Sequence, residues 1–355
     1  MIDYHLWPTD EQKLLLRAAL APDRSALEAI ASWHERVDLG GTVDSGSFRL
    51  LPLVHANLEA LGCGHPVMAM LAGVRKRAWV EAKLRDRFAI EVLRDFADRG
   101  IDTIVTKGLA LAHSVFPDPS LRPMSDVDLL VAPASAESAV AGLQALGFKT
   151  LGGRAALPII GNAVHLHREG GQQIDLHIAP FTDVASVRAQ SWIWSAAIPL
   201  QVGDVSTLRA CDSDMLLHVI VHGLRANPVP PLRWVADAAM IMRRGHDLDW
   251  DRVLYNASKL KVALRLRIGL DFLLRDMDLA IPAGVLDRLR GTRPSIFERL
   301  EIGMIDSRAR PGWAARWGWR AGMTGRMISS GQIGHLRRQV VDFLGRRLGP
   351  SGRRA

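Results

Sequence analysis

The sequence predicts an α+β protein in which a small mixed β-sheet is flanked by N- and C-terminal helical regions. Three changes of pattern along the chain favour this fold class. Residues 1–100 have apolar residues at helical spacing, 101–203 switch to short β-branched and alternating runs, and 204–300 return to helical spacing between Pro and Gly breaks. The chain has 355 residues, which is long enough for two or three structural units.

The N-terminal region is expected to be a set of helices. Thr9 is placed to cap a helix over "DEQKLLLRAAL", and Gln12 stands three residues later, as in a capping box. A long helical pattern follows over 66–99, and Gly100 ends it. Residues 1–100 are therefore predicted to form one helical region.

The central region, 101–203, is expected to hold the sheet in the order β-α-β-α-β-β-β. Each element is assigned from its period, its composition and the turn residues beside it. Strands are expected at 101–106, 126–131, 148–151, 163–168 and 173–180, and helices at 109–116 and 135–147. The turn "REGGQ" makes the last two strands a hairpin.

The C-terminal region is expected to be helical over 204–300, followed by a basic tail over 301–355. Four helices are predicted, at 212–224, 233–244, 249–260 and 261–277. The tail has the weakest periodicity, and only "HLRRQVVDFLGRRL" resembles an amphipathic helix.

Two acidic residues on one strand are the first indication of function. Residues i and i+2 of a strand share a face, so Asp126 and Asp128 point away from the apolar side of "DVDLLV". In "QIDLHIAP", Asp175 and His177 share a face in the same way. Two carboxylates about 4 Å apart repel by roughly 4 kcal/mol at an effective dielectric constant near 20. If the strands are neighbours, the protein must protonate one carboxylate, separate the carboxylates or bind a divalent cation, and oxygen ligands favour Mg²⁺ or Mn²⁺.

Residues before the acidic pair suit a phosphate group. Lys107 and Gly108 follow the first strand and open a helix, where free backbone N–H groups, a glycine and a cation can approach an anion. Arg122 and Ser125 lead into the aspartates and add a second cation and a hydroxyl. The alternative is structural: Arg122 pairs with one of the aspartates, and Ser125 caps a turn.

The predicted hairpin also carries histidines. His165 and His167 share a face across the predicted hairpin from Asp175 and His177, where they can orient carboxylates or contact a substrate. Direct metal ligation and a purely structural role remain open for them. His218 and His222 stand four apart on an apolar helix without a third ligand, so we interpret them as core residues.

These motifs resemble the DNA polymerase beta superfamily of nucleotidyltransferases, and within it the bacterial family described as uncharacterised nucleotidyltransferases. The resemblance rests on "KGLAL", "RPMSDVDLLV" and "QIDLHIAP", and more loosely on "LLHVIVHGL", "RWVADAAMIMRR" and "LDWDRV", over about residues 70–280. It implies divalent metal held by Asp126, Asp128 and Asp175, with Asp175 as general base or metal ligand. The superfamily usually has Gly-Ser where this chain has Lys107-Gly108, so its contacts to phosphate must differ.

The function that this resemblance implies is transfer of a nucleoside monophosphate from an NTP to an acceptor hydroxyl or similar group, with release of pyrophosphate. We expect the acceptor to be a small molecule, peptide or protein, and ATP to be the nucleotide because it is the one most often used. Two alternatives remain: a regulatory module that binds nucleotide or metal without turnover, and an RNA nucleotidyltransferase. The net charge of +8 is concentrated in the C-terminal stretch, since residues 1–298 carry 33 basic and 34 acidic residues. A nearly neutral body argues against polynucleotide binding.

The basic tail has three possible partners. Trp313, Trp317 and Trp319 alternate with arginines, a composition that suits an anionic membrane surface or nucleic acid, or docking onto the protein's own body. No apolar run approaches the length of about 20 residues that spans a bilayer, and the N-terminus lacks the features of a secretory signal. Cys63 and Cys211 form no metal or redox motif, so the expected location is the cytoplasm, in solution or peripheral to the membrane.

Overall fold

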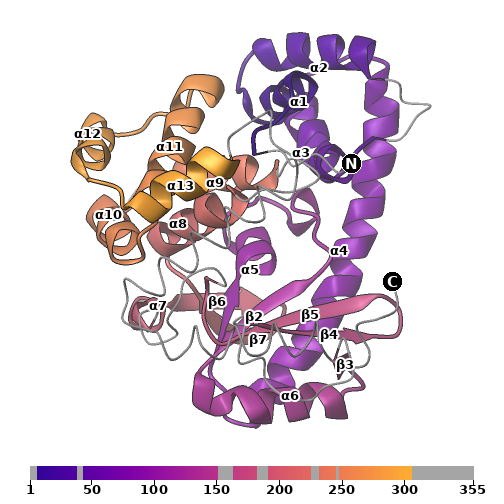
Figure 1. Cartoon of the computed structure of the whole chain (residues 1–355). Coiled ribbons are helices and arrows are strands. Elements are labelled where there is room, and N and C mark those ends of the chain that lie inside the picture. The colour runs from indigo at the N-terminus through magenta and orange to yellow at the C-terminus, as the bar shows by residue number, and fades with distance from the viewer. Residues whose placement is uncertain are drawn as a thin grey trace, which may run out of the picture.

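The computed structural model describes residues 6–37, 43–150, 163–181, 191–224, 232–244 and 248–305. It has the predicted α+β class: one seven-stranded mixed sheet with helices before and after it in the chain (Figure 1). The basic tail from residue 306 onward lies outside the described residues, as does the amphipathic helix predicted in it. The division of the chain at residues 100, 203 and 300 stays a prediction.

Four helices precede the sheet, and their first cap is as predicted. They are α1 (Asp10–Leu20), α2 (Ser25–Arg36), α3 (Ser45–Ala60) and α4 (Val67–Asp98). The Thr9 side chain accepts a hydrogen bond from the Gln12 backbone N–H, and the Gln12 side chain accepts one from the Thr9 N–H. Helix α4 is long enough to run from the other N-terminal helices down along the sheet (Figure 1).

The sheet has the strand order β3-β4-β5-β2-β1-β7-β6. Its strands are β1 (Thr103–Thr106), β2 (Val127–Val131), β3 (Lys149–Thr150), β4 (Ala163–Arg168), β5 (Gln172–His177), β6 (Ile198–Val202) and β7 (Val205–Arg209). The central strands β1 and β2 are antiparallel to each other, whereas β5 is parallel to β2 and β7 is parallel to β1. Every residue of β1 and β2 is buried, so an acidic side chain on either strand needs a partner.

The predicted order of the central elements is confirmed, and one hairpin was missed. Helices α5 (Lys107–Ser114) and α6 (Ala136–Ala145) alternate with the first strands as expected. The missed hairpin is β6–β7, which extends the sheet beyond residue 203. Proline is tolerated in edge strands, and Pro199 lies in β6, which is an edge of the sheet. A proline argues against a strand when only the local sequence is considered, and Pro199 therefore disfavoured the assignment of β6.

The C-terminal helices follow β7. They are α8 (Asp212–Gly223), α9 (Arg233–Arg244), α10 (Trp250–Lys259), α11 (Ala263–Met277), α12 (Ala283–Gly291) and α13 (Ile296–Ile305), after the short α7 (Trp192–Ser195). Helices α8 to α11 correspond to the four predicted, and α12 and α13 are additional. A Cβ atom on Gly223 would lie 2.2 Å from the Trp234 side chain, so α8 and α9 pack closely at this point.

No helix in the described ranges is both long and apolar enough to cross a bilayer.

Candidate functional site

The two acidic strands are neighbours. In the parallel pairing of β2 with β5, Asp128 lies directly opposite Asp175, and His177 follows two residues later on the same face of β5. Side-chain ligand atoms of Asp128, Asp175 and His177 all lie within 4.8 Å of one another. The structure therefore brings together two of the three predicted metal ligands and adds His177, one of the strand histidines for which carboxylate orientation, substrate contact and direct ligation were all open.

Asp128 is buried and held in its charged form. It is 5 % exposed, and its Oδ1 accepts hydrogen bonds from Lys107 Nζ at 2.5 Å and from His177 Nε2 at 2.9 Å. Burial alone would raise the pKa of Asp128, but the Lys107 ammonium and the His177 hydrogen bond together hold it far below its usual range. The carboxylate is therefore ionised at neutral pH, and its Oδ2 has no protein partner among the described residues.

His177 is neutral in this setting. Burial and the nearby Lys107 ammonium lower its pKa, with Asp128 acting in the opposite direction. Its Nδ1 atom is buried and has no hydrogen-bond partner in the described part of the chain. Two carboxylates and an imidazole form a donor set that fits Mn²⁺, while the carboxylates alone also suit Mg²⁺.

The Asp175 carboxylate contacts a histidine of the neighbouring strand β4. His165 of β4 lies opposite Asp175 across the antiparallel hairpin, and His165 Nδ1 is 2.6 Å from Asp175 Oδ1. His165 is exposed and Asp175 is partly buried, so this pair stands at the open side of the cluster. His167 lies opposite Gln173 and is exposed, two residues further from the cluster.

Asp126 occupies a different position from the one that a regular strand would give it. Strand β2 begins at Val127, and Asp126 lies in the preceding segment, where Ser125 Oγ donates to its Oδ1 at 3.3 Å. Asp126 and Asp128 both line a cavity, which is described below. Asp126 does not belong to the group formed by Asp128, Asp175 and His177, whose ligand atoms lie within 4.8 Å of one another. Of the predicted trio, Asp128 and Asp175 therefore belong to this group, whereas Asp126 lies outside it and shares only the cavity with Asp128.

The Lys-Gly pair forms a tight turn between β1 and α5. Lys107 has a positive φ of 47°, which is uncommon for a residue other than glycine, and its Nζ contacts Asp128. A Cβ atom on Gly108 would lie 2.9 Å from Met124 Sδ and 3.2 Å from Arg122 Nη1. Glycine therefore lets the Arg122 guanidinium rest directly against the start of α5.

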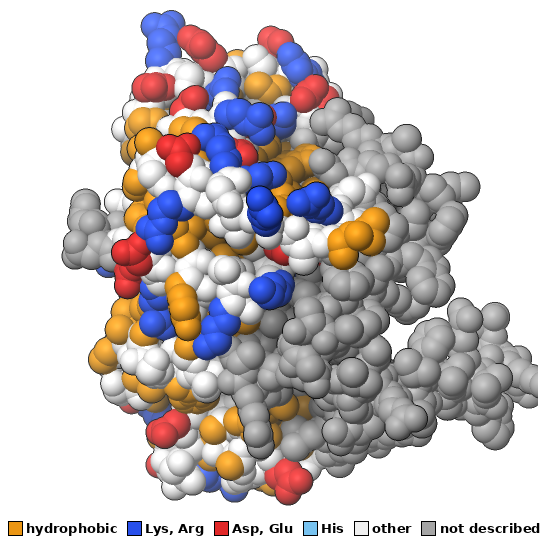
Figure 2. Space-filling view, turned by 60° about the vertical axis from the view of Figure 1, so that its left-hand side comes forward, with side chains coloured by type: hydrophobic (Ala, Val, Ile, Leu, Met, Phe, Trp, Pro, Cys, Tyr) orange, Lys and Arg blue, Asp and Glu red, His pale blue; other side chains and the backbone are white. Residues whose placement is uncertain are grey.

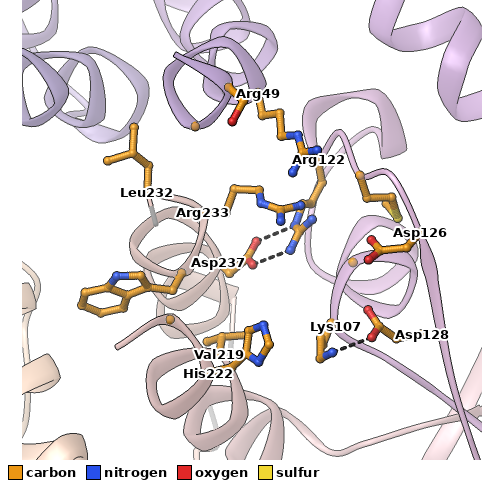
Figure 3. A pocket seen from close by; sticks show the side chains of 16 residues that line it. Arg49, Lys107, Arg122, Asp126, Asp128, Val219, His222, Leu232, Arg233 and Asp237 are labelled. Atoms are coloured by element: carbon orange, nitrogen blue, oxygen red, sulfur yellow. Dashed lines mark hydrogen bonds and ion pairs between the residues drawn. The ribbon is translucent and has the colours of Figure 1, made fainter. Parts of the chain in front are cut away.

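Arg122 pairs with a residue that the sequence analysis did not assign to the site. It was expected either to contact substrate or to pair with Asp126 or Asp128. Instead its Nε and Nη2 donate to Asp237 of α9 at 2.8 and 2.7 Å, and both side chains are buried (Figure 3). No local sequence pattern links the two positions, which are separated by 115 residues.

A cavity of about 350 Å³ opens beside these groups. It is lined from three parts of the chain: the start of α3, the segment from α5 to β2, and helices α8 and α9 (Figure 3). Arg49 and Arg233 project into it and were not predicted as site residues. His222 also lines it, whereas His218 is a core residue, as expected, 2 % exposed with its ring centroid 4.9 Å from that of Phe181.

A mixed sheet that pairs carboxylates on neighbouring strands, next to a strand–turn–helix start suited to phosphate, is the arrangement of nucleotidyltransferases. The chain belongs to the family of uncharacterised nucleotidyltransferases, whose family model matches residues 47–275. The match begins inside α3 and ends inside α11, and it includes the aspartates, the histidines, Lys107 and the arginines described in this section. None of the curated proteins matches the chain.

Proposed function

We propose that this protein is a metal-dependent nucleotidyltransferase that transfers a nucleoside monophosphate from an NTP to an acceptor on a small molecule, peptide or protein. An acceptor oxygen attacks the α-phosphorus, the bond from that phosphorus to the bridging oxygen breaks, and pyrophosphate leaves with that electron pair. ATP is the expected nucleotide. The register of Asp128 opposite Asp175 is the observation that carries this proposal.

Asp128, Asp175 and Asp126 are the residues proposed to hold Mg²⁺ or Mn²⁺, with His177 contributing to the same cluster. A bound divalent ion supplies charge neutralisation for the phosphates and for the developing oxyanion. Asp175 is the proposed general base for the acceptor proton, because it is partly exposed and His165 orients its carboxylate at 2.6 Å. His177 fixes the orientation of Asp128 from a buried position.

The remaining predicted residues are proposed to bind the nucleotide. Lys107 and Gly108 lie at the start of α5, where a phosphate can meet backbone N–H groups and an ammonium. Ser125 is exposed beside Asp126 and offers a hydroxyl to the same substrate. Arg122 lines the cavity while it is anchored by Asp237.

The direct test is release of pyrophosphate from each of the four NTPs with Mg²⁺ or Mn²⁺. We expect metal-dependent release with at least one NTP. Asp128→Asn and Asp175→Asn should each reduce it by at least about 100-fold, beyond the 10–100-fold typical of residues that only support a metal ligand. His167→Gln is the matched control on the same hairpin, and the far-ultraviolet circular dichroism of all variants should be unchanged. Full activity of Asp128→Asn would refute the proposal.

One observation favours the alternative of a nucleotide-binding module without turnover. The Lys107 ammonium already neutralises Asp128, a task that an ion would perform in an enzyme. Under that alternative, NTP binding saturates but no acceptor yields pyrophosphate. Asp175 and His177 gathered beside Asp128 favour the enzyme, because Lys107 contacts only one of the two carboxylates.

An RNA nucleotidyltransferase is the weaker alternative. Binding of a polynucleotide normally requires a continuous basic track on the protein surface. On the face shown in Figure 2, Lys and Arg side chains are instead interspersed with acidic, apolar and uncharged ones. Binding to single-stranded nucleic acid and to anionic vesicles, measured with and without residues 301–355, tests the proposed partners of the tail. The vesicle measurement also tests the proposed peripheral association with a membrane.

A further inference from the structure

Three arginines from different parts of the chain meet in the cavity, and we refer to Arg49, Arg122 and Arg233 as the arginine cluster. Arg49 comes from α3, Arg122 from the segment before β2, and Arg233 is the first residue of α9. Their side chains converge at one end of the cavity (Figure 3). Like charges brought together in this way need a compensating anion.

The protein itself supplies only part of that compensation. Asp237 is bonded to Arg122, whereas neither Arg49 nor Arg233 forms a side-chain hydrogen bond or an ion pair with any residue in the described ranges. Burial lowers the pKa of Arg233 to about 10, and the Arg122 and Arg49 charges act in the same direction. The cluster thus has two guanidinium groups whose donors are unused.

The anion would be held by these side chains and not by the nearby start of α3. The backbone N–H groups of Gly46 and Ser47 already donate to Asp44 Oδ1 at 2.9 and 3.0 Å. This helix end is therefore capped by the protein's own carboxylate, and the guanidinium groups provide the free donors in this part of the cavity.

The position of the cluster indicates which part of a nucleotide it meets. Arg122 rests against Gly108 at the start of α5, and the cavity is also lined by Lys107 and Asp128. Asp175, the proposed base on the acceptor side, is not among the lining residues. A substrate reacting beside Asp128 would therefore extend its leaving group, and not its acceptor, toward the arginines.

We propose that the arginine cluster binds the β- and γ-phosphates of the nucleotide, a role that rests on the proposed function and takes the place of the missing Gly-Ser contact. Guanidinium groups bind phosphate oxygens through paired donors, and they stabilise charge that builds up on a pyrophosphate leaving group. Because the arginines come from α3, the core and α9, the bound polyphosphate also ties the two helical regions to the sheet.

The experiment measures binding of inorganic tripolyphosphate to the full chain by calorimetry, in EDTA so that metal makes no contribution. Arg49→Met and Arg233→Met should each weaken binding by at least about 10-fold, the effect of losing a charge-assisted hydrogen bond. Arg24→Met is the matched control, because Arg24 is 88 % exposed and pairs with the exposed Glu28. Asp128→Asn should still bind tripolyphosphate, which separates binding from turnover.

Three outcomes distinguish this inference from the proposed function. Unchanged tripolyphosphate binding in Arg49→Met and Arg233→Met overturns the role of the cluster, whatever the activity assay gives. Arginine-dependent binding that ATP does not displace overturns the assignment to the nucleotide. Arginine-dependent binding that ATP does displace, without pyrophosphate release from any NTP for any acceptor supplied, supports the cluster and counts against the transfer reaction.

Discussion

The Arg122 guanidinium donates two hydrogen bonds to the Asp237 carboxylate, which joins the segment before β2 to helix α9 across 115 residues. Both side chains are buried, so water cannot replace either partner. The pair holds Arg122 between the sheet and the C-terminal helices, and this is where the cavity lies.

Asp237→Ala should destabilise the protein by about 3–5 kcal/mol, because it leaves the Arg122 charge buried without a partner. The free energy of unfolding from urea titration is the measurement. Arg77→Ala removes an exposed pair with Glu81 and serves as the control, for which we expect a change below about 1 kcal/mol. Equal effects of the two substitutions would show that the buried pair is dispensable.

The pKa of Asp128 predicts a specific dependence of stability on acid. Its folded pKa is far below the unfolded value of about 3.9, so under acidic conditions the unfolded chain binds a proton that the folded chain does not. The stabilisation is complete above the unfolded pKa and is lost as pH falls below it toward the folded pKa. Asp128→Asn should therefore reduce the slope of unfolding free energy against pH by up to about 1.4 kcal/mol per unit below pH 4.

Urea titrations at several values between pH 5 and pH 3, in EDTA, measure that slope. Asp251→Asn is a suitable control, since its side chain is 80 % exposed. Parallel curves for the wild type and Asp128→Asn would contradict the assigned ionisation of Asp128.

Substitution of His177 should weaken metal binding without preventing folding. His177 contacts Asp128 and belongs to the same group of ligand atoms, so His177→Gln should raise the Kd for Mn²⁺ by about 10–100-fold. Electron paramagnetic resonance of free Mn²⁺ gives the Kd. His167→Gln, on the exposed part of the neighbouring strand, should leave the affinity unchanged; an equal loss in both variants would count against a site at His177.

Gly223 should tolerate no side chain. A Cβ atom there would lie 2.2 Å from the Trp234 side chain, so Gly223→Ala must push α8 and α9 apart and should cost about 1–3 kcal/mol. Gly284→Ala in α12 meets nothing within 4 Å and should be neutral or slightly stabilising. Thermal and urea unfolding of the two variants provide the comparison, and a neutral Gly223→Ala would show that the helix contact is loose.

Local sequence patterns were sufficient to predict the strands that carry the acidic residues. Alternation of apolar and polar residues placed Asp128 and Asp175 on one face each, and the parallel register then set them opposite one another. The same reasoning placed Asp126 in the strand, although β2 begins one residue later and Asp126 has a separate position. Strand ends are the least certain part of such a pattern, since a terminal residue has fewer ladder partners to fix it.

The cavity could not be predicted in the same way. Arg49 and Arg233 stand in helices whose periodicity describes only the burial of their own faces. Their convergence with Arg122 depends on how α3 and α9 dock on the core, and no local period contains that information. Asp237 was missed as a partner for the same reason.

Strand β7 has a consequence for how the chain can be divided. It pairs with β1 in parallel, although the two strands are about 100 residues apart, and the chain passes from its last residue, Arg209, into α8 after a short connection. A fragment that stops at residue 203 would leave the β1 side of the sheet uncovered, and exposed strand edges promote aggregation. Expression of a fragment that ends at residue 203 should accordingly give insoluble material, whereas a fragment extended through α11 keeps β1 paired with the β6–β7 hairpin.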